Sequence, residues 1–138
     1  MKARNRFFIA GSILLILTAI AHTLGTLLGG TASNDDEKKL LDLMNNLVLQ
    51  SPDGIRRTMM DIYIGISLSQ ALLTVTLAAI DIAVIRSKAT DELVRKVLWV
   101  NVSMIALLLI PTFKYTVLPA MIMYSLAWLC FLIAFAYS

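Results

Sequence analysis

Four long apolar stretches, separated by short polar segments, dominate the pattern of this chain. They cover about residues 7–30, 59–85, 93–110 and 116–137. A helix needs about 20 residues to cross the ~30 Å hydrocarbon core of a bilayer, so the third stretch is the shortest that qualifies. Lys96 would extend from its first turn to the membrane surface, and Pro111 is expected to end it. The pattern therefore predicts four transmembrane helices.

The first stretch follows the basic sequence MKARNR, and the small residues TAS come after it at 31–33. A secretory signal peptide has the same order, but its apolar region is only about 7–15 residues long. The apolar run in this chain is longer than that. We therefore expect a retained membrane span rather than a cleaved leader.

The long connection at 31–58 has a pattern of its own. Asn34 and Glu37 have the spacing of a capping box at a helix start, and SPDG at 51–54 has turn chemistry. Between them, apolar residues recur at helical spacing: Leu40, Leu41, Met44, Leu47 and Val48. The pattern predicts an amphipathic helix at about 36–50 on the outer face. Its apolar stripe would lie on the bilayer or cap the bundle, and a lid over a site is the alternative.

The composition agrees with a membrane protein. Of the 138 residues, 59% are hydrophobic and 15% are charged. Soluble domains average roughly 45–50% hydrophobic and about 25% charged residues. The expected fold is all-α: a single transmembrane domain over residues 1–138, built as a four-helix bundle with one external amphipathic helix between the first two spans.

The basic residues predict the orientation of the chain. Cytoplasmic loops of membrane proteins carry an excess of Lys and Arg. With the N-terminus inside, seven of the 12 basic residues fall on the inner side and five on the outer side. We expect a protein of a bacterial cytoplasmic (inner) membrane with both termini in the cytoplasm.

Several kinds of chemistry are not expected. The net charge of +3 comes from bases at the segment ends, which form no patch for nucleic acid. Cys130 and His22 are the only cysteine and histidine, too few for a disulfide or for a typical metal site. No nucleophile is paired with a base, so the sequence predicts no catalytic residue, no cofactor and no metal.

The single histidine lies inside the first apolar stretch, where an imidazole facing lipid would be costly. At 1.5 Å per residue, His22 is roughly 10 Å below the outer end of its helix, and Asp61 is about one turn into the second span. Antiparallel neighbours would bring the two to similar depth, with small residues such as Gly65 and Ser69 allowing close approach. Two hypotheses follow: a buried hydrogen-bonded pair that fixes helix register, or a functional pocket.

Other polar residues within the spans give weaker signals. Asp81 is about one turn from Arg86 and is expected to pair with it or to contact water at the cytoplasmic end. Asn101 is expected to bond across to a neighbouring helix. Cys130, deep in an apolar run, is expected to be an unreactive thiol.

The segments HTLG at 22–25 and GIRRTMMDIYIGISLSQA at 54–71, with Met44 between them, resemble a family of small, uncharacterised bacterial four-helix membrane proteins. That family has His-Thr-x-Gly in its first span and an Arg-Thr pair leading into an aspartate, an aromatic residue and Gly-x-Ser in its second. The resemblance covers the first half of the chain. It implies one shared site but no activity: His22, Arg57, Thr58, Asp61, Tyr63 and Gly65.

The expected function is binding of a lipid or small apolar molecule in the outer half of the bundle, between the first two spans. The predicted ligand-binding residues are His22, Thr26, Arg57, Asp61, Tyr63 and Gly65. Asp61 would be the anion, His22 a hydrogen-bond donor or proton acceptor, and Arg57 a contact for a headgroup. One alternative is an oligomeric proton-coupled transporter that uses Asp61 and His22. The other is an accessory subunit of a larger membrane complex, so the expected partners are the bilayer, further copies of the chain or a larger membrane protein.

Overall fold

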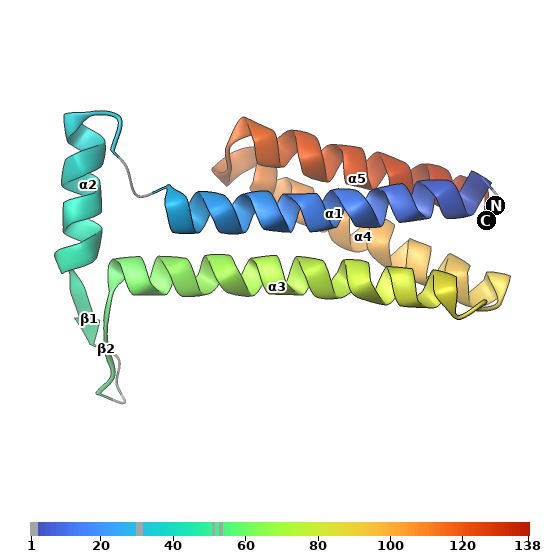
Figure 1. Ribbon diagram of the computed structural model, residues 1–138, viewed down its shortest axis with the longest axis horizontal. Coiled ribbons are helices and arrows are strands. Elements are labelled where there is room, and N and C mark those ends of the chain that lie inside the picture. The colour runs from blue at the N-terminus through green and yellow to red at the C-terminus, as the bar shows by residue number, and fades with distance from the viewer. Residues whose placement is uncertain (1–2, 30–31, 51, 53) are drawn as a thin grey trace. The chain divides into compact units, whose positions relative to one another are not determined.

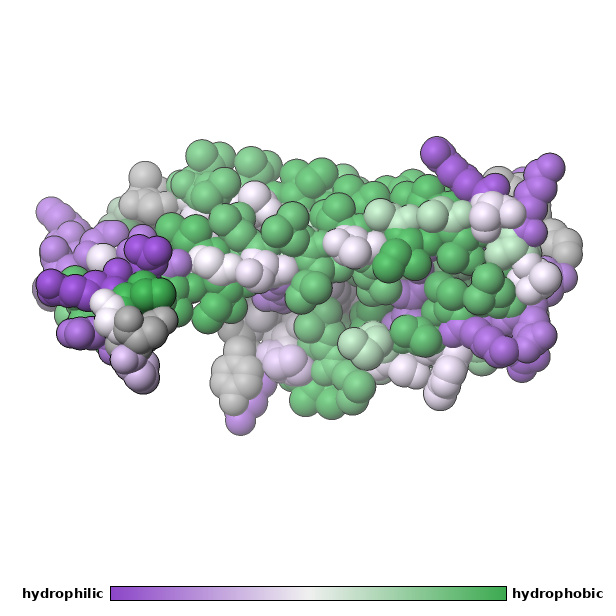
Figure 2. All heavy atoms as spheres, turned by 90° about the horizontal axis from the view of Figure 1, so that it is seen from below, coloured by the Kyte–Doolittle hydropathy of each residue, from purple (hydrophilic) through white to green (hydrophobic). Residues whose placement is uncertain are grey.

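The computed structural model describes residues 3–29, 32–50, 52 and 54–138. Along the chain the elements are α1 (Ala3–Leu28), α2 (Asp35–Asn46), β1 (Val48–Gln50), β2 (Arg56–Thr58), α3 (Met59–Arg86), α4 (Asp91–Tyr115) and α5 (Leu118–Ala136) (Figure 1). Four helices are long and apolar enough to cross a membrane, namely α1, α3, α4 and α5. This confirms the prediction of four spanning helices. On the face shown in Figure 2, hydrophobic residues cover the helices and hydrophilic residues gather at the helix ends.

Contacts along the chain define two compact units. The helical unit comprises Met1–Ala19 and Leu73–Ser138, and the hairpin unit comprises Ile20–Leu72. The boundaries between the two units fall within α1 and within α3.

An aromatic pair and a glycine pack together in the core of the helical unit, which also contains aliphatic side chains. The rings of Phe8 and Phe131 pack edge to face with centroids 5.8 Å apart, an arrangement worth about 0.5–1.5 kcal/mol beyond its buried area. Gly11 lies directly against this pair, since a Cβ there would stand 2.9 Å from the Phe131 ring. The absence of a side chain at Gly11 therefore allows α1 to approach α5, while α5 packs along α4 (Figure 1).

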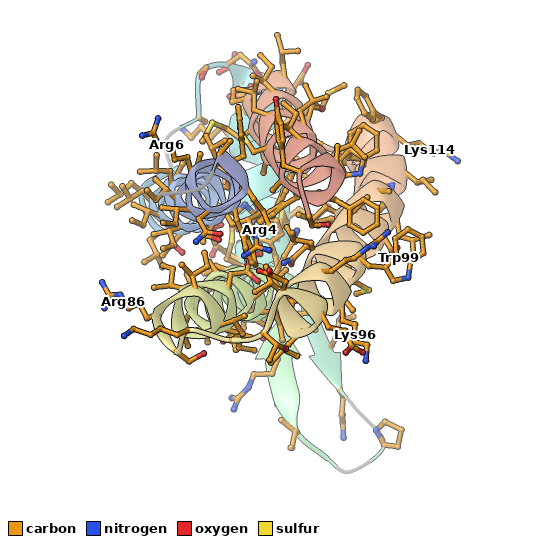
Figure 3. The ribbon with its side chains drawn as sticks, turned by 90° about the vertical axis from the view of Figure 1, so that its right-hand side faces the viewer. Arg4, Arg6, Arg86, Lys96, Trp99 and Lys114 are labelled. Carbon is orange, nitrogen blue, oxygen red and sulfur yellow. The ribbon has the colours of Figure 1, made fainter. Side chains whose placement is uncertain are left out.

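One end of the helical unit is fixed by an ion pair and a ring stack. The Arg4 guanidinium donates to Asp91 Oδ1 at 2.6 Å, and the rings of Phe7 and Tyr137 stack with centroids 6.4 Å apart. Figure 3 shows Arg4 directed between the helices, whereas Arg6 points away from them. The start of α1 therefore lies beside the start of α4 and the end of α5.

The prediction that Pro111 ends the third span is wrong, because α4 continues past it. Proline lacks an N–H and so removes one hydrogen bond, the one that Leu107 would accept, while its fixed φ suits a helix. Two threonine hydroxyls in the turn that follows donate back to carbonyl groups of the same helix. Thr112 Oγ1 donates to the Leu108 carbonyl at 2.7 Å, and Thr116 Oγ1 donates to the Thr112 carbonyl at 2.8 Å.

The predicted helix cap lies in the hairpin unit. The Asn34 side chain accepts from the backbone N–H of Glu37 at 2.8 Å, and the Glu37 carboxylate accepts from the N–H of Ser33 at 2.6 Å. These bonds satisfy two N–H groups at a helix start that have no partner within the helix. The helix start expected at Asn34 is confirmed.

The end of α2 differs from the prediction, because residues 48–50 form a strand and not the last turn of a helix. Strand β1 pairs antiparallel with β2, with Val48 opposite Thr58, and the N–H of Met59 donates to the Leu47 carbonyl at 2.9 Å. Val48 is β-branched and suits a strand. The predicted turn at 51–54 falls between the strands, with residues 51 and 53 outside the described residues, and Gly54 has φ +84°.

The apolar stripe of α2 is only partly covered in the hairpin unit. Leu41 and Met44 are half-buried, while Leu40 and Leu47 are exposed. Contact of this stripe with the bilayer stays a prediction.

Substituting Gly11 tests the close approach of α1 to α5. We expect Gly11→Val to destabilise the bundle by about 1–3 kcal/mol through overpacking, seen as a lower thermal midpoint in mild detergent. Gly65→Val is the control, because a Cβ at Gly65 has no atom within 4 Å. Equal midpoints for the two variants would contradict the packing of Gly11 on Phe131.

Candidate functional site

A buried carboxylate joins three of the spanning helices. Asp81 Oδ1 accepts from Asn101 Nδ2 at 2.7 Å, and Asp81 Oδ2 lies 3.2 Å from the hydroxyl of Ser12. All three side chains are fully buried, with 0% of their surface exposed. We name Ser12, Asp81 and Asn101 the Asp81 cluster. It connects α1, α3 and α4 inside the helical unit.

Helical spacing explains why these three residues are buried. Buried positions on α3 recur at intervals of three or four: Ser67, Ala71, Thr74, Ala78 and Asp81. On α1 Ser12 lies between the buried residues Phe8 and Leu15, and on α4 Asn101 follows Leu98 by three. Each polar residue of the Asp81 cluster therefore occupies a core position of its helix.

The structure corrects one prediction about these residues and confirms another. Asp81 neither pairs with Arg86 nor contacts water, because its side chain is fully buried while Arg86 is exposed and points away from the helices (Figure 3). Five residues along an α-helix turn the side chain by about 140°, which places Arg86 on another face. Asn101 bonds to a neighbouring helix as predicted.

A shallow groove of about 270 Å³ runs between α3 and α4 beside the Asp81 cluster. It is lined by Leu77, Ile80, Asp81, Lys96, Val97, Val100 and Asn101. Lys96 forms an exposed ion pair with Glu92 at 2.6 Å. Asn101 Oδ1 is buried and has no hydrogen-bond partner among the described residues, so the groove has apolar walls with one free acceptor next to them.

The six residues predicted as a site all belong to the hairpin unit. Arg57 is exposed on β2, opposite Leu49. The Asp61 carboxylate accepts from the N–H of Thr58 at 2.9 Å, and the N–H of Asp61 donates to Thr58 Oγ1 at 3.0 Å. This reciprocal pair caps the start of α3, so Asp61 has a local structural role.

His22 is half-buried on α1, and its Nε2 atom is buried without a hydrogen-bond partner in the described part of the chain. The structure therefore contains no direct hydrogen bond between His22 and Asp61. Thr26 is also half-buried, whereas Tyr63 and Gly65 are exposed. The small-residue face of Gly65 and Ser69, which was expected to meet α1, is on the exposed side of α3. A contact between His22 and Asp61 through water or a ligand stays a prediction.

Comparison with protein-family models, with curated proteins and with solved structures yields no match for this chain. The fold itself defines the class: a membrane protein built as a helix bundle with four apolar helices. Within that class, the Asp81 cluster brings buried polar side chains of three spanning helices together beside the groove.

Substitutions at the start of α3 test the role of Asp61 as a cap. We expect Thr58→Ala and Asp61→Ala each to cost about 0.5–2 kcal/mol of stability, measured as a lower thermal midpoint in detergent. Because the two residues act as one unit, the double variant should lose less than the sum. Ser69→Ala serves as the control, since its hydroxyl bonds only to its own helix at Gly65. Additive losses would contradict a reciprocal cap.

Proposed function

We propose that the protein binds a lipid in the membrane, with an acyl chain in the groove between α3 and α4 and an anionic headgroup at Lys96. The observation that carries this proposal is the composition of the groove. Its walls are aliphatic, and a lysine stands at the end that is nearer the start of α4.

The size of the groove favours a chain over a compact ligand. Its volume of about 270 Å³ is below the range of about 300–1,000 Å³ that holds drug-sized molecules. Ile80 and Val100 in its walls are about half exposed, and in a spanning helix such residues face hydrocarbon. An acyl chain can therefore enter from the bilayer without crossing water.

The surroundings of Lys96 suit a phosphate group. Its ion pair with Glu92 is exposed on both sides, and pairs of this kind on helices are worth only about 0.3–0.5 kcal/mol. A phosphate can replace Glu92 at little cost. Trp99, one turn further along α4 and on the same outer side (Figure 3), is a residue type that favours the headgroup level of a bilayer.

The sequence-predicted pocket around His22 is a second candidate position for a ligand. It is supported by the buried Nε2 atom of His22, which has no partner among the described residues, and by half-buried Thr26 on the same helix. The involvement of Asp61 with Thr58 leaves His22 as the main polar contact there. If the protein is instead a transporter or an accessory subunit, we expect no selective lipid retention in the groove or in the pocket around His22.

Lipid retention tests the groove. The protein is reconstituted in nanodiscs of equal phosphatidylglycerol and phosphatidylcholine, then released for native mass spectrometry. We expect Val100→Trp, which fills the groove, to reduce bound lipid about tenfold, a loss of about 1.4 kcal/mol. Leu107→Trp is the control, because Leu107 is exposed on the same helix but does not line the groove.

Lys96→Gln should remove the preference for phosphatidylglycerol while leaving total lipid similar, with Arg6→Gln as a control at another exposed base. Equal retention by all four variants would exclude the groove. A loss seen only in His22→Ala would instead favour the pocket in the hairpin unit.

For the location, our proposal is a bacterial inner membrane with both termini in the cytoplasm. The contacts of Phe7 with Tyr137 and of Arg4 with Asp91 support a common side for the two ends of the chain. We expect an alkaline phosphatase fused after Ser138 to be inactive and one inserted after Asn46 to be active. Activity only in the Ser138 fusion would reverse the orientation.

A further inference from the structure

The hydroxyl of Ser12 has more acceptors than it can serve. Ser12 Oγ lies 3.0 Å from the carbonyl oxygen of Phe8 and 3.2 Å from Asp81 Oδ2. A hydroxyl group has one proton to donate, and an ionised carboxylate only accepts. If Asp81 were ionised, the two acceptors would compete for a single proton, and one contact would leave two oxygens facing each other without a hydrogen between them.

We infer that Asp81 is a proton-binding site within the membrane and holds one proton on Oδ2. The protonated carboxyl then donates to Ser12 Oγ, Ser12 donates to the Phe8 carbonyl, and Asn101 Nδ2 donates to Asp81 Oδ1. This single proton gives every contact of the Asp81 cluster both a donor and an acceptor. Release of the proton leaves the carboxylate and transfers H⁺ to water.

The charges around the Asp81 cluster agree with a neutral acid. Ser12 and Asn101 are uncharged donors, and an isolated carboxylate in an apolar interior is very costly. From α1, Arg4 is paired with Asp91. From α4, Lys96 lines the same groove, but its ion pair is with Glu92.

Within the described residues of the helical unit, α3 and α5 supply no positive charge to Asp81. On its own helix, Arg86 is exposed and points outward (Figure 3). Helix α5 has no charged residue, and its titratable groups are Tyr124 and Cys130. A carboxyl group that is fully buried among these residues keeps its proton.

A water molecule that enters the groove would give this proton a route to solvent. Asp81 and Asn101 both line it, and Lys96 lines it at the end toward the start of α4. Asn101 Oδ1, which has no partner among the described residues, can accept a hydrogen bond from an entering water molecule. Proton exchange therefore depends on wetting of the groove, whereas the protonation of Asp81 itself does not require that a lipid binds there.

Infrared spectroscopy of the protein in nanodiscs tests the inference directly. At neutral pH we expect the carbonyl stretch of a protonated carboxylic acid, which shifts in D₂O and disappears in Asp81→Asn. Asp61→Asn is the matched control and should retain the band, because Asp61 is exposed in the hairpin unit. A band that persists in Asp81→Asn, or no band in the wild-type protein, would overturn the inference.

Thermal stability supplies a second measurement. The amide of Asp81→Asn has the shape and hydrogen bonds of a neutral carboxyl, so this variant should keep a thermal midpoint within a few degrees of wild type, whereas Asp81→Leu should fall well below it. Raising the pH until the carboxyl ionises should lower the midpoint of the wild type but not of Asp81→Asn. An Asp81→Asn protein that fails to fold, or that is as unstable as Asp81→Leu, would also count against a protonated Asp81.

Discussion

The hydrocarbon core of a membrane contains no water to bond with polar groups, so polar side chains of a spanning helix need partners inside the protein. The Asp81 cluster is the clearest result of this constraint. Its hydrogen bonds join α1, α3 and α4 at one level. A shift of one residue along α1 would move Ser12 by about 1.5 Å and turn it by about 100°, which would break its contact with Asp81. The cluster therefore fixes the helix register that the apolar core alone would leave loose.

Much of the fold could be predicted because its signals are local. Length and hydrophobicity identify the four spans, and the pair Asn34 and Glu37 marks the start of α2. The parts that could not be predicted depend on distant partners. Residues 48–50 pair with residues 56–58, and this pairing replaces the last helical turn that the apolar pattern suggested. Pro111 fails as a helix end because its fixed φ is compatible with a helix, and α4 continues to Tyr115.

The candidate site was harder to predict, because burial of a face depends on all the helices around it. Asp61 drew attention as an acid near a span, yet Thr58 and Asp61 have the spacing of a cap, a signal that explains the contact observed. Ser12 carried no signal of its own, since serine is unremarkable in a membrane helix. At a rise of 1.5 Å per residue, Ser12 lies roughly 13 Å from the start of α1, and Asn101 lies roughly 15 Å from the start of α4. That similarity in depth could have paired their helices, but the face on which they meet could not be known from one sequence.

The ion pair between Arg4 and Asp91 has a consequence for biogenesis. These residues are 87 positions apart, so the ribosome delivers Arg4 to the membrane long before Asp91 has been made. Until then the guanidinium has to remain among lipid phosphates at the membrane surface. Formation of this ion pair is therefore a late event in assembly, because it requires the start of α4 to have been made.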